Sequence, residues 1–172
     1  TDLGGGIFRI VEQYYREDYR CNMYLVKGKT FDIVIDAGLG LGSLKQFLKY
    51  ASRDPVLVLS HAHYDHIGSI DQFPKAMIHL QKAELMTWIE ALALPARFGF
   101  LTSALDPDDI HTAISAAAEH RLNLIDGDKD DVLPGIHVRS AAGGHTLGQQ
   151  FVAIDPKKGR YVVPGDCIYS QR

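Results

Sequence analysis

The chain has 172 residues and a hydrophobic share of 46%, which is enough for one soluble globular domain, residues 1–172, with a sizeable core. A net charge of −3 argues against a nucleic-acid partner, which needs a basic surface, and no apolar run is long enough for a membrane span. Cys21 and Cys167 fit no metal or redox spacing, so we expect no disulfide framework and a cytoplasmic location.

The N-terminal part of the sequence predicts strands followed by an outer helix. A glycine-rich start over residues 1–6 is expected to fray. Apolar runs predict three strands, with a hairpin turn between the second and the third. These strands are expected over residues 7–13, 22–27 and 31–36. Apolar residues at helical spacing then predict a helix over residues 43–51 that packs on the sheet.

The rest of the chain predicts further strands and helices in turn. Strands are expected over residues 55–60, 76–80, 122–125 and 135–140, with a hairpin formed by residues 150–154 and 160–163. Helices are expected over residues 81–92 and 110–120, the second after a helix start at Asp106-Pro107. The apolar residues 91–105 are irregular, and the acidic residues 126–131 predict a solvated turn.

Four potential metal ligands fall within six residues, directly after the apolar strand 55–60. They are His61, His63, Asp65 and His66, and a short helix is expected to begin in residues 67–70. Imidazole nitrogens and carboxylate oxygens are usual ligands of zinc and similar ions, whereas the same groups buried without partners are costly. The cluster therefore predicts a metal site at the carboxyl end of a central strand. The alternative is a solvated loop, or histidines that cap a helix.

The pattern His-x-His-x-Asp-His resembles the metallo-β-lactamase superfamily, and the later segments Gly144-His145-Thr146 and Gly165-Asp166 extend the resemblance over nearly the whole chain. The resemblance implies an α+β fold, the four-layer αββα sandwich. It also implies two zinc ions, with iron or manganese as alternatives. By the resemblance, His61, His63 and His145 hold one ion, Asp65 and His66 hold part of the second, and Asp166 bridges both.

Two further expectations concern the surroundings of this site. The family's last metal ligand is a histidine well after the Gly-Asp pair, and the sequence offers no residue for it, so we expect the C-terminal part of the fold to be missing from the chain. Asp36, which ends the strand 31–36, is expected either to hydrogen-bond a ligand histidine or to cap a turn.

The resemblance also implies an activity on a small-molecule substrate. A metal-bound hydroxide would open an ester-type bond, and Asp65 would orient the nucleophile or carry the proton. Tyr169, three residues after Asp166, resembles the tyrosine with which acyl-homoserine lactonases bind the substrate carbonyl, so a lactone is the leading prediction. Residues 91–105 would either cover the site and accept an acyl chain or serve as a core connector.

Thioesterase-like members share the Gly-Asp-x-x-Tyr spacing, so an acyl-thioester hydrolase is the alternative. A mononuclear iron persulfide dioxygenase would leave Asp65 and His66 without a role. A non-catalytic, metal-stabilised binding domain would fit the missing histidine. A nuclease is disfavoured by the net charge. The oligomeric state stays open.

Overall fold

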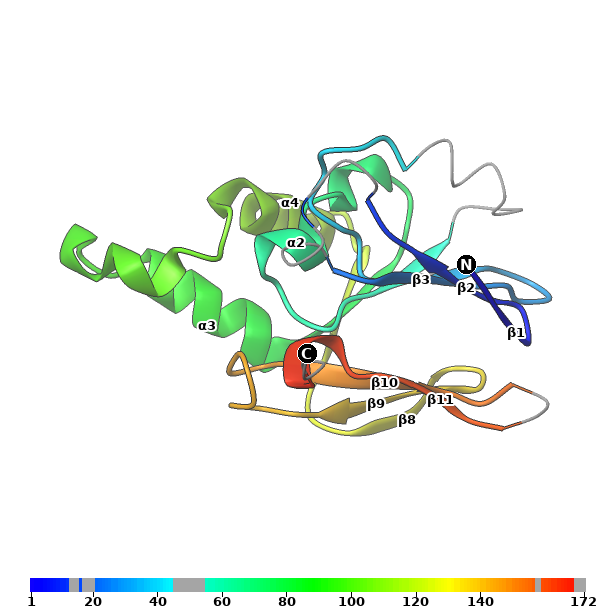
Figure 1. The fold of residues 1–172 in the computed structure, drawn as a ribbon. Helices are drawn as coiled ribbons and strands as arrows, with labels where there is room; N and C mark the ends of the chain where they lie inside the picture. The colour runs from blue at the N-terminus through cyan, green and yellow to red at the C-terminus, as the bar shows by residue number, and fades with distance from the viewer. Residues whose placement is uncertain (13–15, 17–20, 45–54, 157–158, 169–172) are drawn as a thin grey trace.

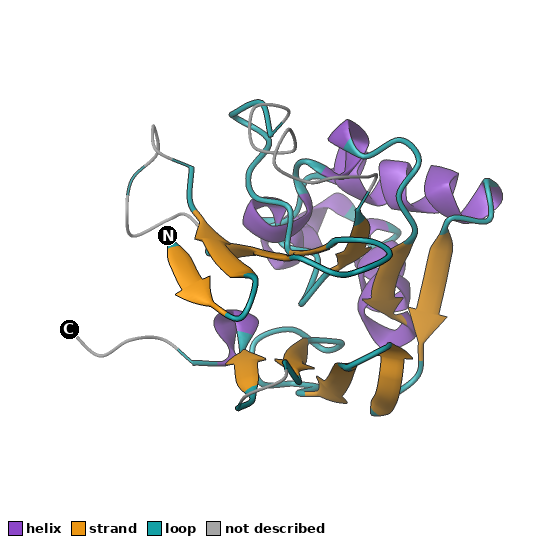
Figure 2. Ribbon diagram, turned by 90° about the vertical axis from the view of Figure 1, so that its right-hand side faces the viewer, coloured by secondary structure: helices purple, strands orange, loops and turns teal. Residues whose placement is uncertain are grey.

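Two β-sheets packed face to face form the body of the protein, and helices cover the outer face of the larger sheet (Figures 1 and 2). The computed structural model describes residues 1–12, 16, 21–44, 55–156 and 159–168. Within these ranges, no helix combines the length and the apolar character that crossing a bilayer requires. The described residues supply one helical layer and both sheets of the predicted α+β sandwich, and the fold class is confirmed.

The larger sheet has seven strands among the described residues, in the same order in space as in the sequence. Its first half is antiparallel and its second half, from β4 to β7, is parallel. The strands are β1 (Asp2–Gly4), β2 (Ile7–Ile10), β3 (Met23–Val26), β4 (Ile33–Ile35), β5 (Val56–Val58), β6 (Ile78–Gln81) and β7 (Leu122–Ile125).

The smaller sheet is antiparallel and lies below the larger one in Figure 1, in the order β11-β10-β9-β8. Its strands are β8 (Lys129–Leu133), β9 (Ile136–Ser140), β10 (Gln150–Ile154) and β11 (Tyr161–Val163). The predicted hairpin is confirmed, because β10 pairs with β11 from Val152 opposite Val163 to Ile154 opposite Tyr161.

Most helices of the described residues lie between parallel strands of the larger sheet. They are α2 (Tyr64–Ile67), α3 (Lys82–Leu92) and α4 (Pro107–Ala118), with 3-10 helices η1 (Ile70–Gln72) and η2 (Ala96–Thr102), whereas the 3-10 helix η3 (Gly165–Cys167) follows β11. Helix α4 starts as predicted, because Asp106 accepts a hydrogen bond from the Asp108 N–H and Pro107 stands in the first turn.

Residues of the central strands alternate between two cores. Val34 and Leu57 belong to the core under the helices, whereas Ile33, Ile35 and Val58 belong to the core between the sheets. This alternation follows from the period of two in a strand, and it leaves both faces of β4 and β5 covered. The carboxyl ends of β4, β5 and β6 therefore meet at one rigid edge of the sheet, which is where open α/β sheets place their sites.

Three local predictions need correction, and one lies outside the described ranges. Residues 1–6 do not fray as a unit, because β1 pairs with β2. The acidic segment is a turn only at its start, since its second half is the edge strand β8. The short helix begins inside the histidine motif, at Tyr64, and not after it. The helix predicted over residues 43–51 falls largely on residues that the structure does not describe.

Candidate metal centre

The first group of metal-ligand side chains consists of His61, His63 and His145. One nitrogen from each ring lies within 4.8 Å of the others. His61 and His63 come from the loop after β5, and His145 comes from the loop between β9 and β10, so the two sheets together build the group. Nε2 of His145 lies 2.9 Å from Nδ1 of His63. This is the set that the family resemblance assigns to the first metal ion.

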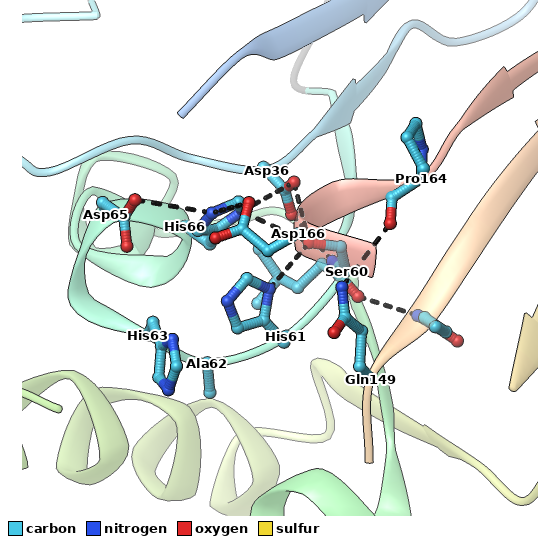
Figure 3. Close-up of polar contacts among 12 residues, drawn as sticks. Asp36, Ser60, His61, Ala62, His63, Asp65, His66, Gln149, Pro164 and Asp166 are labelled. Carbon is cyan, nitrogen blue, oxygen red and sulfur yellow. Dashed lines mark hydrogen bonds and ion pairs between the residues drawn. The ribbon is translucent and has the colours of Figure 1, made fainter. Parts of the chain in front are cut away.

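The second group consists of His61, His66 and Asp166, whose ligand atoms also lie within 4.8 Å of one another. The Asp166 carboxylate stands between the two groups: Oδ1 is 3.3 Å from Nε2 of His66, and Oδ2 is 3.6 Å from Nε2 of His145. Such a position is what a carboxylate that bridges two ions requires. Asp65 is close by, with Oδ2 3.5 Å from Nε2 of His66 (Figure 3).

The histidine nitrogens fit a bound metal ion in chemistry as well as in position. Nε2 of His61 is buried and has no hydrogen-bond partner among the described residues, a costly state for a polar atom. Nε2 of His66 is also buried, and it makes no hydrogen bond of good geometry although it faces the carboxylates of Asp65 and Asp166. Each of these rings uses its other nitrogen for a neighbouring side chain, since Nδ1 of His61 lies 3.1 Å from Oγ of Ser60. A metal ion at Nε2 would satisfy both rings.

Asp36 and Ser60 hold the ring of His66 in place, as the dashed lines of Figure 3 show. Nδ1 of His66 donates to Oδ2 of Asp36 at 2.9 Å, and the same carboxylate accepts from the Ser60 N–H at 2.7 Å and the Ser60 hydroxyl at 2.9 Å. The prediction that Asp36 hydrogen-bonds a ligand histidine is confirmed as a contact. Asp36 has φ of 59°, a left-handed conformation that the buried network maintains at this site.

The histidines of the site differ in the charge that their surroundings favour. Burial, together with the neighbouring His66, His63 and His145, lowers the pKa of His61 far below its ordinary value. Burial and His145 likewise lower the pKa of His63 to about 4. Both rings are therefore neutral at pH 7, which is the state that binds metals.

The carboxylates have the opposite effect on His66. Although burial opposes a charge there, Asp36, Asp166 and Asp65 raise the pKa of His66 to about 10. Burial raises the pKa of Asp65 above its ordinary value, with His66 opposing the shift and Asp166 adding to it. The carboxylates around His66 therefore favour a positive charge at its Nε2 atom, and a divalent cation bound there would supply that charge.

Gln149 positions the turn that carries Asp166. With its carboxamide oxygen turned toward this turn, that oxygen accepts from the Cys167 N–H at 2.9 Å and from the Asp166 N–H at 3.0 Å. Gly165 has φ of 54°, and a Cβ there would lie 2.8 Å from the Ser60 side chain, so the turn approaches the β5 loop closely because the residue is glycine.

The predicted site residues therefore have different outcomes. The structure brings together His61, His63, His66, His145 and Asp166, with Asp65 beside them, and their roles as ligands remain predictions. Tyr169 lies outside the described residues. Sequence reasoning missed the contributions of Ser60, Gln149 and the buried Glu84. A signal existed for Glu84, which stands one helical turn before Trp88 on the face that packs inward.

The apolar segment after α3 returns to the histidine motif. The backbone N–H of Tyr64 donates to the carbonyl of Ala104 at 3.0 Å, and the Trp88 ring lies 5.5 Å from the His63 ring. None of the η2 residues is buried, and Phe100 and Leu101 are 69% and 47% exposed. The η2 part of the segment therefore presents apolar side chains to solvent, whereas Leu105 at its end is buried in the core under the helices.

Comparisons with known proteins agree with this geometry. The family model of the metallo-beta-lactamase superfamily matches residues 16–172. The chain is 32% identical to the acyl-coenzyme A thioesterase MBLAC2 of Homo sapiens, over 97% of this chain and 65% of the human protein. It is 30% identical to the thioesterase of the same name from Gallus gallus, over 97% of this chain and 64% of the other. The chain thus spans less than two thirds of these relatives.

Solved structures of similar fold include hydrolases and lactonases. The crystal structure of the hydrolase AbOPH, of the beta lactamase superfamily, has a TM-score of 0.67 and 27% identity, and the match covers 85% of this chain and 55% of that one. AidC, a dizinc quorum-quenching lactonase, has a TM-score of 0.61 and 27% identity over 83% of this chain and 54% of its own. From the histidine motif, the sandwich fold and the family match together, the chain belongs to the metallo-beta-lactamase superfamily.

Proposed function

We propose that the protein is a metal-dependent hydrolase of acyl thioesters, in which water converts the thioester into a carboxylic acid and a free thiol. The observation that carries the hydrolase proposal is the pair of ligand groups that share His61, with Asp166 between His66 and His145. This arrangement suits two divalent ions, and zinc fits a donor set of imidazoles and carboxylates.

The thioester is the alternative of the sequence analysis, and we prefer it here to the leading prediction, which was a lactone. Similarity at 32% identity to a thioesterase runs over 97% of the chain, and this supports the alternative better than the lactone. The Gly-Asp-x-x-Tyr spacing that suggested a lactonase does not distinguish the two branches. A lactone remains a second candidate because the fold resembles that of the lactonase AidC.

Within this proposal, each group of side chains has a task. When bound, the ions supply Lewis acidity and lower the pKa of a coordinated water toward about 7. His61, His63 and His145 would hold one ion, Asp65 and His66 would hold the other, and Asp166 would serve both. Asp65, whose pKa is raised by burial, would hold a proton at its carboxylate for transfer to the departing thiolate. Asp36 would keep His66 oriented through its Nδ1.

The exposed apolar side chains of η2 support an acyl substrate. Leu94, Phe100 and Leu101 stand on a segment that is joined to the His63 side of the site through α3 and Trp88. An acyl chain laid over them would remove apolar surface from water. The polar end of the substrate would then lie toward the ligand groups.

The test compares two substrates on the full-length protein. We expect release of free thiol from an acyl-coenzyme A, loss of this activity after chelation, and recovery on adding zinc. The same preparations should be assayed with an N-acyl homoserine lactone. Lactone opening without thiol release would move the assignment to the second candidate, and activity that survives complete metal removal would contradict a metal-dependent hydrolase.

A further inference from the structure

We infer that Glu84 is a positioning residue that clamps together the two loops bearing the first group of ligands, His61 and His63 on one loop and His145 on the other. The inference rests on the proposed function, since it treats these histidines as metal ligands. Glu84 lies in the first turn of α3 and is completely buried. No sequence motif contains it.

Four donors converge on the Glu84 carboxylate. Oε1 accepts from the Ala62 N–H at 2.9 Å and from the Trp88 indole N–H at 2.8 Å. Oε2 accepts from the Thr146 hydroxyl at 2.6 Å and from the Gly148 N–H at 2.9 Å. One oxygen therefore serves the β5 loop and α3, and the other serves the loop between β9 and β10.

Each of these partners is adjacent to a ligand. Ala62 stands between His61 and His63, Thr146 follows His145, and the Trp88 ring lies against the ring of His63 at 5.5 Å. The hydrogen bonds fix the backbone on either side of the ligands and not the imidazole rings themselves. Glu84 thus sets the distance between the β5 loop and the His145 loop. This distance determines whether the three histidines can reach one metal ion.

The His145 loop and the start of α3 are packed in close contact. A Cβ on Gly148 would lie 2.0 Å from the backbone nitrogen of Glu84, so the His145 loop is pressed against the start of α3. A buried carboxylate is costly unless its oxygens are satisfied, and here both are. Such an arrangement suits a residue that holds two segments at a fixed distance. Removing any one donor would leave part of the buried carboxylate charge without a hydrogen bond.

The decisive variant is Glu84→Gln, which keeps the shape but offers one acceptor oxygen. The amide NH₂ must then face either the Ala62 and Trp88 donors or the Thr146 and Gly148 donors. One loop is released while the other stays bound. We expect cobalt(II), used as a spectroscopic probe, to bind the full-length variant about 10- to 100-fold more weakly than wild type, the range seen when groups behind metal ligands are removed. The visible spectrum of the bound cobalt should also change.

Asp32→Asn is the matched control. Asp32 is also completely buried and accepts from Lys27 Nζ at 2.9 Å and the Gly28 N–H at 3.1 Å, but it lies at the amino end of β4, away from the ligands. Its loss should lower the melting temperature and leave the cobalt spectrum unchanged. A merely structural role for Glu84 predicts the same pattern for Glu84→Gln, and this result would overturn the inference.

A second pair of variants covers the case in which Glu84→Gln does not fold. Thr146→Val removes a single donor and keeps the side-chain volume, whereas Thr146→Ser retains the hydroxyl. We expect a smaller change of the cobalt spectrum in the valine variant and a near-normal spectrum in the serine variant. Identical spectra for valine and wild type would contradict the clamp.

The readout separates this inference from the proposed function. A wild-type protein that binds cobalt but hydrolyses no thioester would refute the thioesterase proposal, while the spectra of the variants would still decide the role of Glu84. A wild-type protein that binds no cobalt would overturn both.

Discussion

Asp36 and Glu84 are both buried carboxylates beside the ligand groups, yet they act on them in different ways. Asp36 touches a ligand ring directly, through Nδ1 of His66. Glu84 touches the backbone and side chains of residues next to the ligands. The His66 group is therefore aligned by a side-chain contact at the end of one strand, whereas the first group is aligned by the distance between two loops from different sheets.

This difference predicts how each half of the site responds to damage. A change at Asp36 should affect one ring and hence the second metal site. A change at Glu84 should affect the spacing of several ligands at once and hence the first site. The following variants break or sharpen this contrast, and they are ordered from the largest expected effect on the site to the smallest.

His61→Ala should have the largest effect, because His61 belongs to both groups of neighbouring side chains and is a ligand of the first ion in the proposed function. Groups behind metal ligands contribute about 10- to 100-fold, so loss of a ligand itself should exceed about a hundredfold in kcat/KM. Metal content should fall at the first site, as measured by elemental analysis on the full-length protein. Full metal content in the variant would contradict His61 as a ligand.

Asp36→Asn should weaken only one half of the site. Asparagine tolerates the left-handed conformation at this position, so the backbone is spared. Its single oxygen cannot replace a carboxylate that accepts from Ser60 and His66 together. In a zinc titration we expect the second equivalent to bind about 10- to 100-fold more weakly, with the first unchanged. Equal weakening of both equivalents would remove the contrast with Glu84.

Trp88→Phe should disturb the same group of ligands as Glu84→Gln does, but less strongly. The change removes the indole N–H from Oε1 of Glu84, which keeps the Ala62 donor. A hydrogen bond to a charged group contributes about 1.5–3 kcal/mol, so denaturant unfolding should show a loss within this range. Cobalt affinity should fall less than in Glu84→Gln. A larger fall than in that variant would mean that the Trp88 ring itself, and not Glu84, places His63.

Asp109→Asn should leave the metal site unaffected and change stability alone. Burial and the neighbouring Asp106, Asp71 and Asp108 raise the pKa of Asp109 to about 6, from an ordinary value of 3.8. The folded chain thus holds this proton more tightly than the unfolded chain, and the resulting stability is lost as pH rises through about 6.

Above that pH the variant should be more stable than wild type. The carboxylate is half exposed, so we expect a gain of about 1 kcal/mol, or roughly 2–4 °C in melting temperature. Below pH 4 the Asp109 carboxyl is protonated and neutral, as asparagine is, so the two proteins should melt together. A variant less stable than wild type at pH 7 would show that Asp109 is stabilised by its helix and not strained by its neighbours.

The sequence was informative wherever the chemistry is local. The ligand motif, the strand before it and the helix start at Asp106 each depend on residues within a few positions, and the structure places all three close to where they were expected. The position of Asp36 near the site could also be predicted, because Asp36 ends a strand that neighbours β5 in the sheet.

Glu84 was not predicted, because three of its four partners lie 22, 62 and 64 residues away in sequence and a charged residue in an amphipathic helix ordinarily faces solvent. Strand β8 was missed because its acidic composition is typical of a turn. As an edge strand it tolerates charge, and Asp130 pairs with Arg139 of the adjacent strand. The sequence could not decide between lactone and thioester, because the spacing that suggested a lactone is common to both branches, and the comparisons support the thioester better.

The long reach of the Glu84 contacts also fixes the order in which the site can be assembled. The clamp joins residues 62 and 84 to residues 146 and 148, and Gln150 reaches the carbonyl of Leu59 across 91 positions. Contacts of such sequence separation form late, after the loops between them have closed. During synthesis the histidine motif leaves the ribosome long before His145 and Asp166 do. The nascent chain would therefore hold an incomplete set of the proposed ligands, and both groups would be complete only after the second sheet has folded.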